Sequence, residues 1–129
     1  MSADAVVLNV LSERTIGCAF VVANTVGSGF LEKVYENALA RELRDAGFAV
    51  VQQRGLAVHY KGAVVGEYVP DILVENALIV EVKAARALDD VHRAQCLNYL
   101  RATDLTLCLL LNFGRPRLEI RRVVWQLQE

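Results

Sequence analysis

Two apolar segments separated by a short polar stretch, within residues 70–83, most restrict how this chain can fold. Apart from Glu81, residues 72–74 and 78–82 are aliphatic and rich in β-branched side chains, a composition that favours β-strands. Asn76, between them, is a common turn residue. The pattern predicts an antiparallel hairpin, and the charged residues at its far end need a structural or chemical reason.

The register of this hairpin decides whether its charges can act together. Asp71 precedes the first strand, and Glu81 and Lys83 lie two residues apart near the end of the second. Because strand side chains alternate between faces, a two-residue turn would send Asp71 and Glu81 to opposite faces. A three-residue loop pairs Val74 with Leu78 and sets Asp71 opposite Glu81 on one face. We predict this second register.

In that register the two carboxylates form a hard-oxygen site that suits Mg²⁺ or Mn²⁺, with water in the remaining positions. Hydrolysis of a phosphodiester needs an activated water and neutralisation of charge on the phosphoryl oxygens. Lys83 is placed for the second role. A Glu-x-Lys strand alone is common on solvated surfaces, but the apolar setting and the preceding aspartate favour a metal-dependent nuclease.

The rest of the sequence predicts a single α/β domain over residues 1–129, with helices and strands in mixed order. Apolar spacing predicts helices over residues 3–23 and 29–46, the second ended by Gly47. Asp89 or Asp90 can begin a later helix that runs to about residue 102. Strands are expected over residues 49–53, 56–60, 63–74, 78–83, 105–113 and 117–125. The strand 105–113 is apolar enough to be buried on both faces, and Arg121 or Arg122 in the last strand should face solvent.

Charge is unevenly distributed along the chain. The formal net charge of −1 counts against nucleic-acid binding, because phosphate contacts usually show as a basic excess. Residues 83–129, however, hold eight basic and five acidic side chains, whereas residues 1–82 hold six and ten. We expect the acidic part to hold metal and the basic part, with Arg86 and Arg93, to contact nucleic acid. The arginines of residues 115–122 fit a nucleic-acid track and a solvated edge strand equally well.

Composition also limits the setting of the protein. The chain has three cysteines, Cys18, Cys96 and Cys108. Their odd number and apolar surroundings favour reduced core residues over disulfides, and neither they nor the two separated histidines have zinc-ligand spacing. The apolar stretch 16–26 is too short to cross a bilayer, and the N-terminus lacks the basic start of a secretory signal. We therefore expect a cytoplasmic protein with no membrane partner.

Several motifs together carry a family resemblance over most of the chain. They are Gly29-Phe30-Leu31-Glu32 at a helix start, Tyr60-Lys61-Gly62, Pro70-Asp71, Glu81-Val82-Lys83, Gln95-Cys96-Leu97-Asn98-Tyr99 and Leu111-Asn112-Phe113-Gly114. With these motifs the sequence resembles the GxxExxR family, a branch of the PD-(D/E)xK nuclease superfamily. That family often has an arginine just before the aspartate, where this chain has Tyr68-Val69-Pro70.

The resemblance implies a restriction-endonuclease-like αβββαβ core, with a central mixed sheet flanked by helices. It implies that Asp71 and Glu81 are metal ligands and that Lys83 is the catalytic lysine. Glu32 would be the acidic residue contributed by a helix. Gln95 and Tyr99 resemble the Gln-x-x-x-Tyr motif that lies beside the active site in the exonuclease branch, which gives Gln95 a catalytic role and Tyr99 a nucleic-acid contact.

Three functional classes are compatible with these observations. The first is a nuclease that cuts DNA, working as a homodimer that joins two sites across a duplex or junction, as in the similar-looking Holliday-junction resolvases. The second is a module that keeps the fold without meaningful turnover and binds nucleic acid or a protein partner. Another metal-assisted hydrolase is the third, although no other nucleophile or base cluster is visible.

Overall fold

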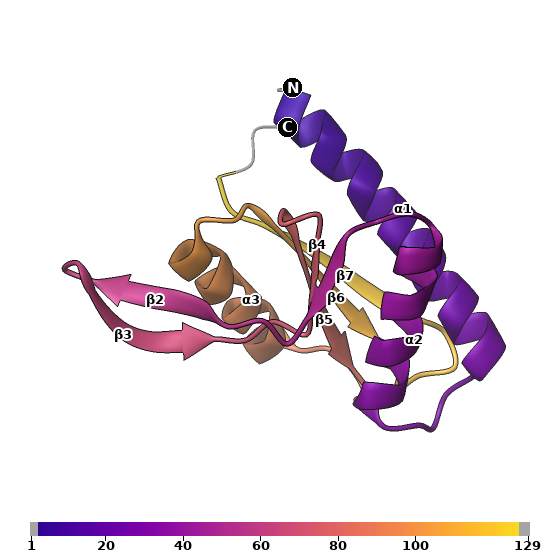
Figure 1. Cartoon of the computed structure of the whole chain (residues 1–129). Coiled ribbons are helices and arrows are strands. Elements are labelled where there is room, and N and C mark those ends of the chain that lie inside the picture. The colour runs from indigo at the N-terminus through magenta and orange to yellow at the C-terminus, as the bar shows by residue number, and fades with distance from the viewer. Residues whose placement is uncertain (1–2, 127–129) are drawn as a thin grey trace.

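The computed structural model describes residues 3–126, in which a central sheet lies between helices. Helices α1 (Ala3–Val26) and α2 (Glu32–Asp45) cover one face of the sheet, and α3 (Asp90–Thr103) covers the other (Figure 1). The strands are β1 (Val50–Gln52), β2 (Leu56–Tyr60), β3 (Ala63–Tyr68), β4 (Ile72–Val74), β5 (Leu78–Lys83), β6 (Leu107–Asn112) and β7 (Glu119–Val124). This arrangement confirms the predicted α/β class.

The central sheet has the strand order β1-β4-β5-β6-β7. Strands β5 and β6 are parallel, whereas the other neighbouring pairs are antiparallel, so the sheet is mixed as expected. Every residue of β6 is buried, which confirms the prediction from its continuous apolar sequence. Both Arg121 and Arg122 of β7 are exposed. Parallel neighbours cannot be joined by a tight turn, and here the chain crosses from β5 to β6 through α3.

Alternation along β5 divides its side chains between two cores. Val80 and Val82 pack in the cluster that includes α1 and α2, and Ile79 packs in the cluster that includes α3. Glu81 therefore lies on the α3 face of the sheet, in line with Ile79. The site charges and α3 are thus brought to the same side by the period-two pattern of one strand.

The hairpin of β4 and β5 has the predicted register. Val74 pairs with Leu78, and the three residues between them form the loop. Glu75 and Asn76 both adopt φ +53°, and the Ala77 N–H donates to the Val74 carbonyl at 3.0 Å. Extending this register by one residue beyond Ile72 and Val80 sets Asp71 opposite Glu81.

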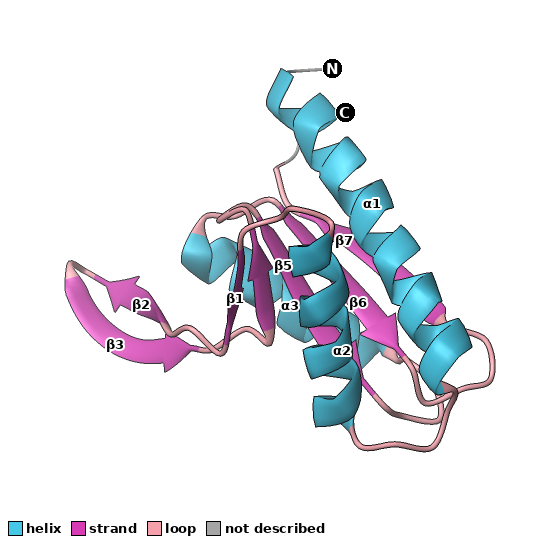
Figure 2. Ribbon diagram, turned by 45° about the vertical axis from the view of Figure 1, so that its right-hand side comes forward, coloured by secondary structure: helices cyan, strands magenta, loops and turns pink. Residues whose placement is uncertain are grey.

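One expected strand, residues 63–74, is divided into β3 and β4. Pro70 stands in the break and has no N–H to donate to a sheet neighbour, so pairing stops there. The consequence is a separate two-stranded sheet, β2 with β3, that extends from the body of the molecule (Figures 1 and 2). We call this β2–β3 hairpin the arm. Most of its residues are exposed, but Tyr68 at its base is buried.

Helix α1 is longer than expected, and residues 4–26 are long and apolar enough to cross a membrane by length and composition. The stretch 16–26 alone did not suggest this. In the structure the helix packs on α2 and on β5 and β6 through one face, as a core helix of a soluble protein also does. The cysteines within residues 3–126 are free, with Cys96 and Cys108 buried and Cys18 half-buried.

Candidate active site

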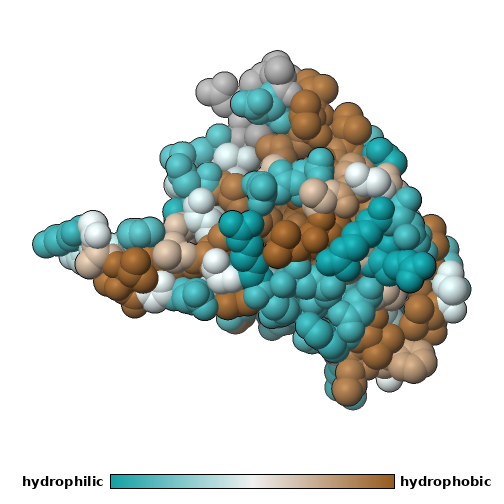
Figure 3. Space-filling view, viewed as in Figure 1, coloured by the Kyte–Doolittle hydropathy of each residue, from teal (hydrophilic) through white to brown (hydrophobic). Residues whose placement is uncertain are grey.

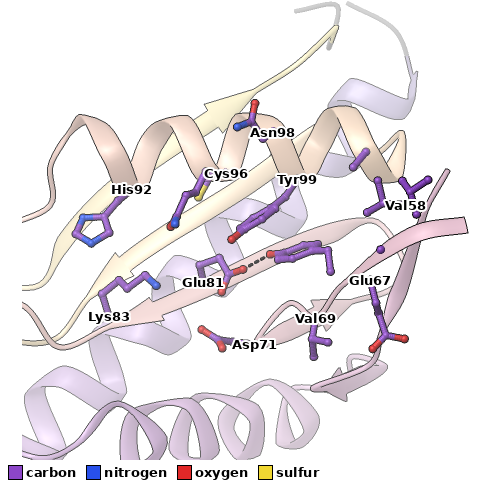
Figure 4. Close-up of a pocket in the computed structure, with 15 residues that line it drawn as sticks. Val58, Glu67, Val69, Asp71, Glu81, Lys83, His92, Cys96, Asn98 and Tyr99 are labelled. Atoms are coloured by element: carbon purple, nitrogen blue, oxygen red, sulfur yellow. Dashed lines mark hydrogen bonds between the residues drawn. The ribbon is translucent and has the colours of Figure 1, made fainter. Parts of the chain in front are cut away.

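An open pocket of about 610 Å³ lies between the end of the hairpin β4–β5, helix α3 and the base of the arm (Figure 4). Five of the residues singled out from sequence line it, namely Asp71, Glu81, Lys83, Gln95 and Tyr99. Asp71, Glu81 and Lys83 come from the hairpin and the other two from α3. Figure 4 shows the three hairpin side chains pointing toward one another. The fold therefore joins two motifs that are separated in sequence.

The carboxyl groups of Asp71 and Glu81 are in direct contact in this pocket. Asp71 is fixed by its Oδ2 atom, which accepts a hydrogen bond from the Val82 N–H at 2.8 Å. Glu81 is only 6% exposed. The pKa of Glu81 is raised to about 8, chiefly because the side chain is buried. The hydrogen bond with Asp71 and the negative charge of Asp71 add to this rise. The surroundings of Glu81 therefore favour its protonated form at neutral pH.

Two stacked tyrosines form the wall beside Glu81. The Tyr68 hydroxyl donates a hydrogen bond to Glu81 Oε1, drawn as a dashed line in Figure 4, and this bond opposes the rise in the Glu81 pKa. The rings of Tyr68 and Tyr99 stack with centroids 3.5 Å apart and an interplanar angle of 14°. Burial, and then the charge of Glu81, raises the pKa of both hydroxyls. Both tyrosines are thus neutral hydrogen-bonding groups at physiological pH.

Lys83 is held at the end of β5 by the parallel pairing with β6. It is half-buried, and its pairing partner is Asn112. Asn112 is fully buried; its Oδ1 accepts from the N–H groups of Ala85 and Gly114 at 2.9 and 3.0 Å, and its Nδ2 donates to the Ala85 carbonyl at 3.0 Å. One amide side chain therefore fixes the chain just after Lys83.

The helical carboxylate linked to the pocket is Glu36 and not the predicted Glu32. Glu32 is the first residue of α2, is exposed and does not line the pocket. Glu36, one turn later, is 4% exposed, and its Oε1 accepts from Gln53 Nε2 at 2.9 Å. The same Gln53 nitrogen donates to Asp71 Oδ1 at 3.3 Å, and the Gln53 N–H donates to the Asp71 carbonyl at 3.1 Å. Gln53 thus connects the two acids.

Arg86 and Arg93 are exposed and lie outside the pocket lining, Arg86 in the loop after β5 and Arg93 on α3. His92, which the sequence gave no reason to select, does line the pocket. Its Nδ1 accepts from the Asp89 N–H at 3.2 Å, so the ring also belongs to the capping box of α3. Tyr68, Gln53 and Glu36 were missed in the same way; only the shared helix face of Glu32 and Glu36 offered a signal.

The donor set fits a magnesium-type ion. Across residues 3–126, no three His, Cys, Asp or Glu side chains gather in a way that could hold a metal by themselves. Two adjoining carboxylates with water as the remaining ligands are nevertheless a usual arrangement for Mg²⁺, which keeps several waters. The charge of Asp71 disfavours the ionised form of Glu81, and a bound cation would offset that repulsion. Asp71 and Glu81 are therefore the residues that would hold the ion.

Comparison with known proteins agrees with this geometry. The family model described as the PD-(D/E)XK nuclease superfamily matches residues 9–123. Comparison with curated proteins gave no significant match. A crystal structure of the protein SSO0001 shares 16% sequence identity at a TM-score of 0.55, and the match covers 74% of this chain and 52% of that one. This likeness concerns the fold alone, and the chain spans about half the length of that protein.

Proposed function

We propose, from the premise that this chain belongs to the PD-(D/E)XK nuclease superfamily, that it is a metal-dependent nuclease that hydrolyses phosphodiester bonds in DNA. The observation that carries the proposal is the meeting of Asp71, Glu81 and Lys83 in one pocket through the predicted hairpin register. Two carboxylates can hold a metal ion that activates a water, and an ammonium group can neutralise charge on the phosphoryl oxygens, which are the two requirements of metal-assisted phosphodiester hydrolysis.

Each residue has a separate part in this proposal. Asp71 and Glu81 hold Mg²⁺ or Mn²⁺, which when bound supplies an acidified, oriented water and neutralises phosphate charge. Binding requires that Glu81 lose its proton, and the Tyr68 hydroxyl then stabilises the carboxylate through its hydrogen bond. Lys83 places its positive charge where negative charge develops on the phosphoryl oxygens.

Residues around these three orient the ligands and the substrate. Glu36 acts through Gln53, which holds Asp71 by both its backbone and its side chain. Gln95 and Tyr99 project from α3 into the pocket, where an amide and a ring face can contact a nucleotide beside the scissile bond. Arg86 and Arg93 contact flanking phosphates outside the pocket. Glu32 lies exposed at the start of α2, so we assign the role of the helical acidic residue to Glu36 in its place.

The finer assignments are also proposals. We place the chain in the GxxExxR branch on the spacing of Gly29 and Glu32, although Tyr35 stands at the position of the arginine in that motif. We propose DNA as the substrate, a single cytoplasmic domain over residues 1–129, and a homodimer that presents two sites to one duplex or junction. A short pocket in a small domain supports the dimer, since one copy can hold only a few nucleotides.

Cleavage of labelled single-stranded, double-stranded and branched DNA, with matched RNA, tests the activity in Mg²⁺ and Mn²⁺. The variants are Asp71→Asn, Glu81→Gln and Lys83→Met, which keep side-chain size while removing one charge each. Asp45→Asn is the control, because it neutralises an exposed carboxylate outside the pocket. We expect the three site variants to lose at least about 100-fold in rate and the control to keep wild-type activity.

Different outcomes identify the alternatives. Cleavage that survives Asp71→Asn or Lys83→Met at the wild-type rate would refute the assignment of the site. DNA binding that weakens with salt, without products under any metal condition, would favour the nucleic-acid-binding module over the nuclease. Cleavage of RNA in preference to DNA would leave the site intact and change the substrate.

A further inference from the structure

The face of α1 directed away from the protein is apolar at both ends and charged in the middle. Its exposed apolar side chains are Val6, Val7, Val10, Phe20 and Val21, with exposed fractions between 42% and 65%. Glu13 and Arg14 lie between them and are also exposed. Figure 3 shows hydrophobic surface gathered toward the N-terminal end of α1. Single exposed valines are ordinary, but five large apolar side chains exposed on one helix face are typical of an interaction surface.

These residues repeat at intervals of seven. Positions 6, 13 and 20 form one row, and positions 7, 14 and 21 form a second. Val10, Gly17 and Asn24 form a third row between them. At about 100° per residue, the third row runs along the centre of the exposed face, with the other rows roughly 40° to 60° on either side. Seven-residue spacing keeps these side chains on one face of the helix, and apolar residues recur there two heptads apart, at 6 and 20 and at 7 and 21.

We propose that this face of α1 pairs with the same face of a second copy of the chain, the two helices running parallel about a two-fold axis along their length. In such a pair each residue of the first row faces the second row of the other copy at the same level. Val6 therefore meets Val7, and Phe20 meets Val21, of the second copy. Glu13 meets Arg14 of the second copy, and the two-fold axis makes that ion pair occur twice.

Charge selects the parallel orientation. In an antiparallel pair each row would face itself, which sets Glu13 against Glu13 and Arg14 against Arg14 of the second copy. Like charges in contact oppose association, whereas opposite charges favour it. Within residues 3–126, neither Glu13 nor Arg14 has an ion-pair partner in its own chain, although the Arg14 guanidinium lies 4.6 Å from the centroid of the Phe48 ring. Both charges are therefore available to the second copy.

The central row suits close parallel contact. Gly17 has no side chain, and a Cβ added there meets no atom of the same chain within 4 Å, so another backbone can approach. Asn24 would face Asn24 of the second copy, and an asparagine on the axis favours a parallel, in-register pair. A membrane is a less suitable occupant of this face, because Glu13 and Arg14 would have to enter the apolar layer.

Charge reversal tests the pairing. Sedimentation velocity from about 1 µM to about 1 mM should show reversible dimerisation of the wild-type protein. Glu13→Arg and Arg14→Glu should each weaken the dimer about tenfold, since each creates two like-charged contacts. The double variant should recover the wild-type dissociation constant to within about threefold, because it exchanges the charges and keeps the pairing. In an antiparallel dimer each of these residues faces its own counterpart, so each single variant would exchange one like-charged pair for another and leave the dissociation constant near the wild-type value.

A cross-link tests the orientation directly. The thiols introduced by Gly17→Cys should form an intermolecular disulfide under mild oxidation, because the axis brings them together. In an antiparallel pair the thiol would lie opposite Val10 of the second copy, about 10 Å along the helix from the other thiol, too far to bridge. The wild-type chain with its three native cysteines, and Arg41→Cys on α2, are the controls. Circular dichroism confirms that each variant is folded.

Several results would overturn the proposal. A monomer at all concentrations, or a double variant as weak as the single ones, would remove the interface. Sedimentation of a monomeric protein with phosphatidylcholine vesicles would assign the patch to a membrane instead. The inference does not depend on the proposed nuclease, because oligomeric state is measured without substrate, and an inactive chain could still dimerise as described.

Discussion

Replacement of Glu81 by glutamine should stabilise the metal-free protein at alkaline pH. The pKa of Glu81 is about 8 in the folded protein, against 4.5 for an unperturbed glutamate. Between these pH values the folded protein binds more protons at this group than the unfolded chain does. The free energy of unfolding therefore falls as pH rises through that window, and the contribution of Glu81 to stability is fully present only below it.

The size of the effect follows from the difference between the two pKa values. At about 1.4 kcal/mol per pH unit, the shift corresponds to roughly 5 kcal/mol between pH 4 and pH 9, as an upper bound. Glutamine keeps the hydrogen-bonding pattern of the protonated acid toward Tyr68 and Asp71 but cannot ionise. The variant should match the wild type near pH 5 and exceed it by several kcal/mol near pH 9.

Urea unfolding in EDTA, followed by Trp125 fluorescence from pH 5 to pH 9, measures this difference. Glu67→Gln, which neutralises an exposed carboxylate of the same pocket, is the matched control and should leave the wild-type pH dependence unchanged. A gap between Glu81→Gln and wild type that stays constant within about 0.5 kcal/mol over the whole range would refute the buried, protonated state of Glu81. Adding Mg²⁺ at pH 8 should stabilise the wild type and not the variant.

Three further predictions concern the surroundings of the site. Tyr68→Phe removes a hydrogen bond that favours the ionised form of Glu81, so the pKa of Glu81 should rise above about 8. The pH midpoint of Mn²⁺ binding, measured by calorimetry, should then move upward, and an unchanged midpoint would contradict this. Gln53→Ala should weaken Mn²⁺ binding about 10- to 100-fold with little change in secondary structure, as loss of a ligand-orienting partner does, and equal affinity would remove its positioning role. Gly114→Ala should lower the free energy of unfolding by about 1–3 kcal/mol, because the added Cβ would lie 2.4 Å from the Ala85 carbonyl oxygen. Gly66→Ala, which places its Cβ in open space, should change the free energy of unfolding far less in the same denaturation assay.

The hairpin register could be predicted because two short-range rules agree on it. Strand alternation and the three-residue loop together set Asp71 opposite Glu81, and the structure has the Val74–Leu78 pair that this requires. The burial of strand β6 could also be predicted, since a run of apolar residues without alternation is typical of a strand covered on both faces. The mixed sheet was implied by the family resemblance alone.

Contacts between segments far apart in the sequence could not be predicted from strand alternation and loop length. The choice between Glu32 and Glu36 depends on which face α2 turns to the sheet, and Glu36 is selected by Gln53, which lies 17 residues further along the chain. Tyr68 can donate to Glu81 because strand pairing is interrupted at Pro70, which leaves the arm separate from the central sheet. His92 lines the pocket because of the orientation of α3 about its own axis. Each of these depends on tertiary packing, which local sequence patterns do not encode.

The two halves of the site differ in the sequence separation of the contacts that hold them. Asp71 and Glu81 belong to one hairpin closed by a three-residue loop, so their carboxyl groups can come together through local contacts alone. The segment after Lys83 is fixed by Asn112, 27 residues beyond Ala85, across a parallel pairing that needs α3 in place. Because non-local contacts form late, the acidic half should assemble first and the lysine should be positioned last. Under the proposed function, a state in which only the hairpin has formed would bind cations before its lysine could assist hydrolysis.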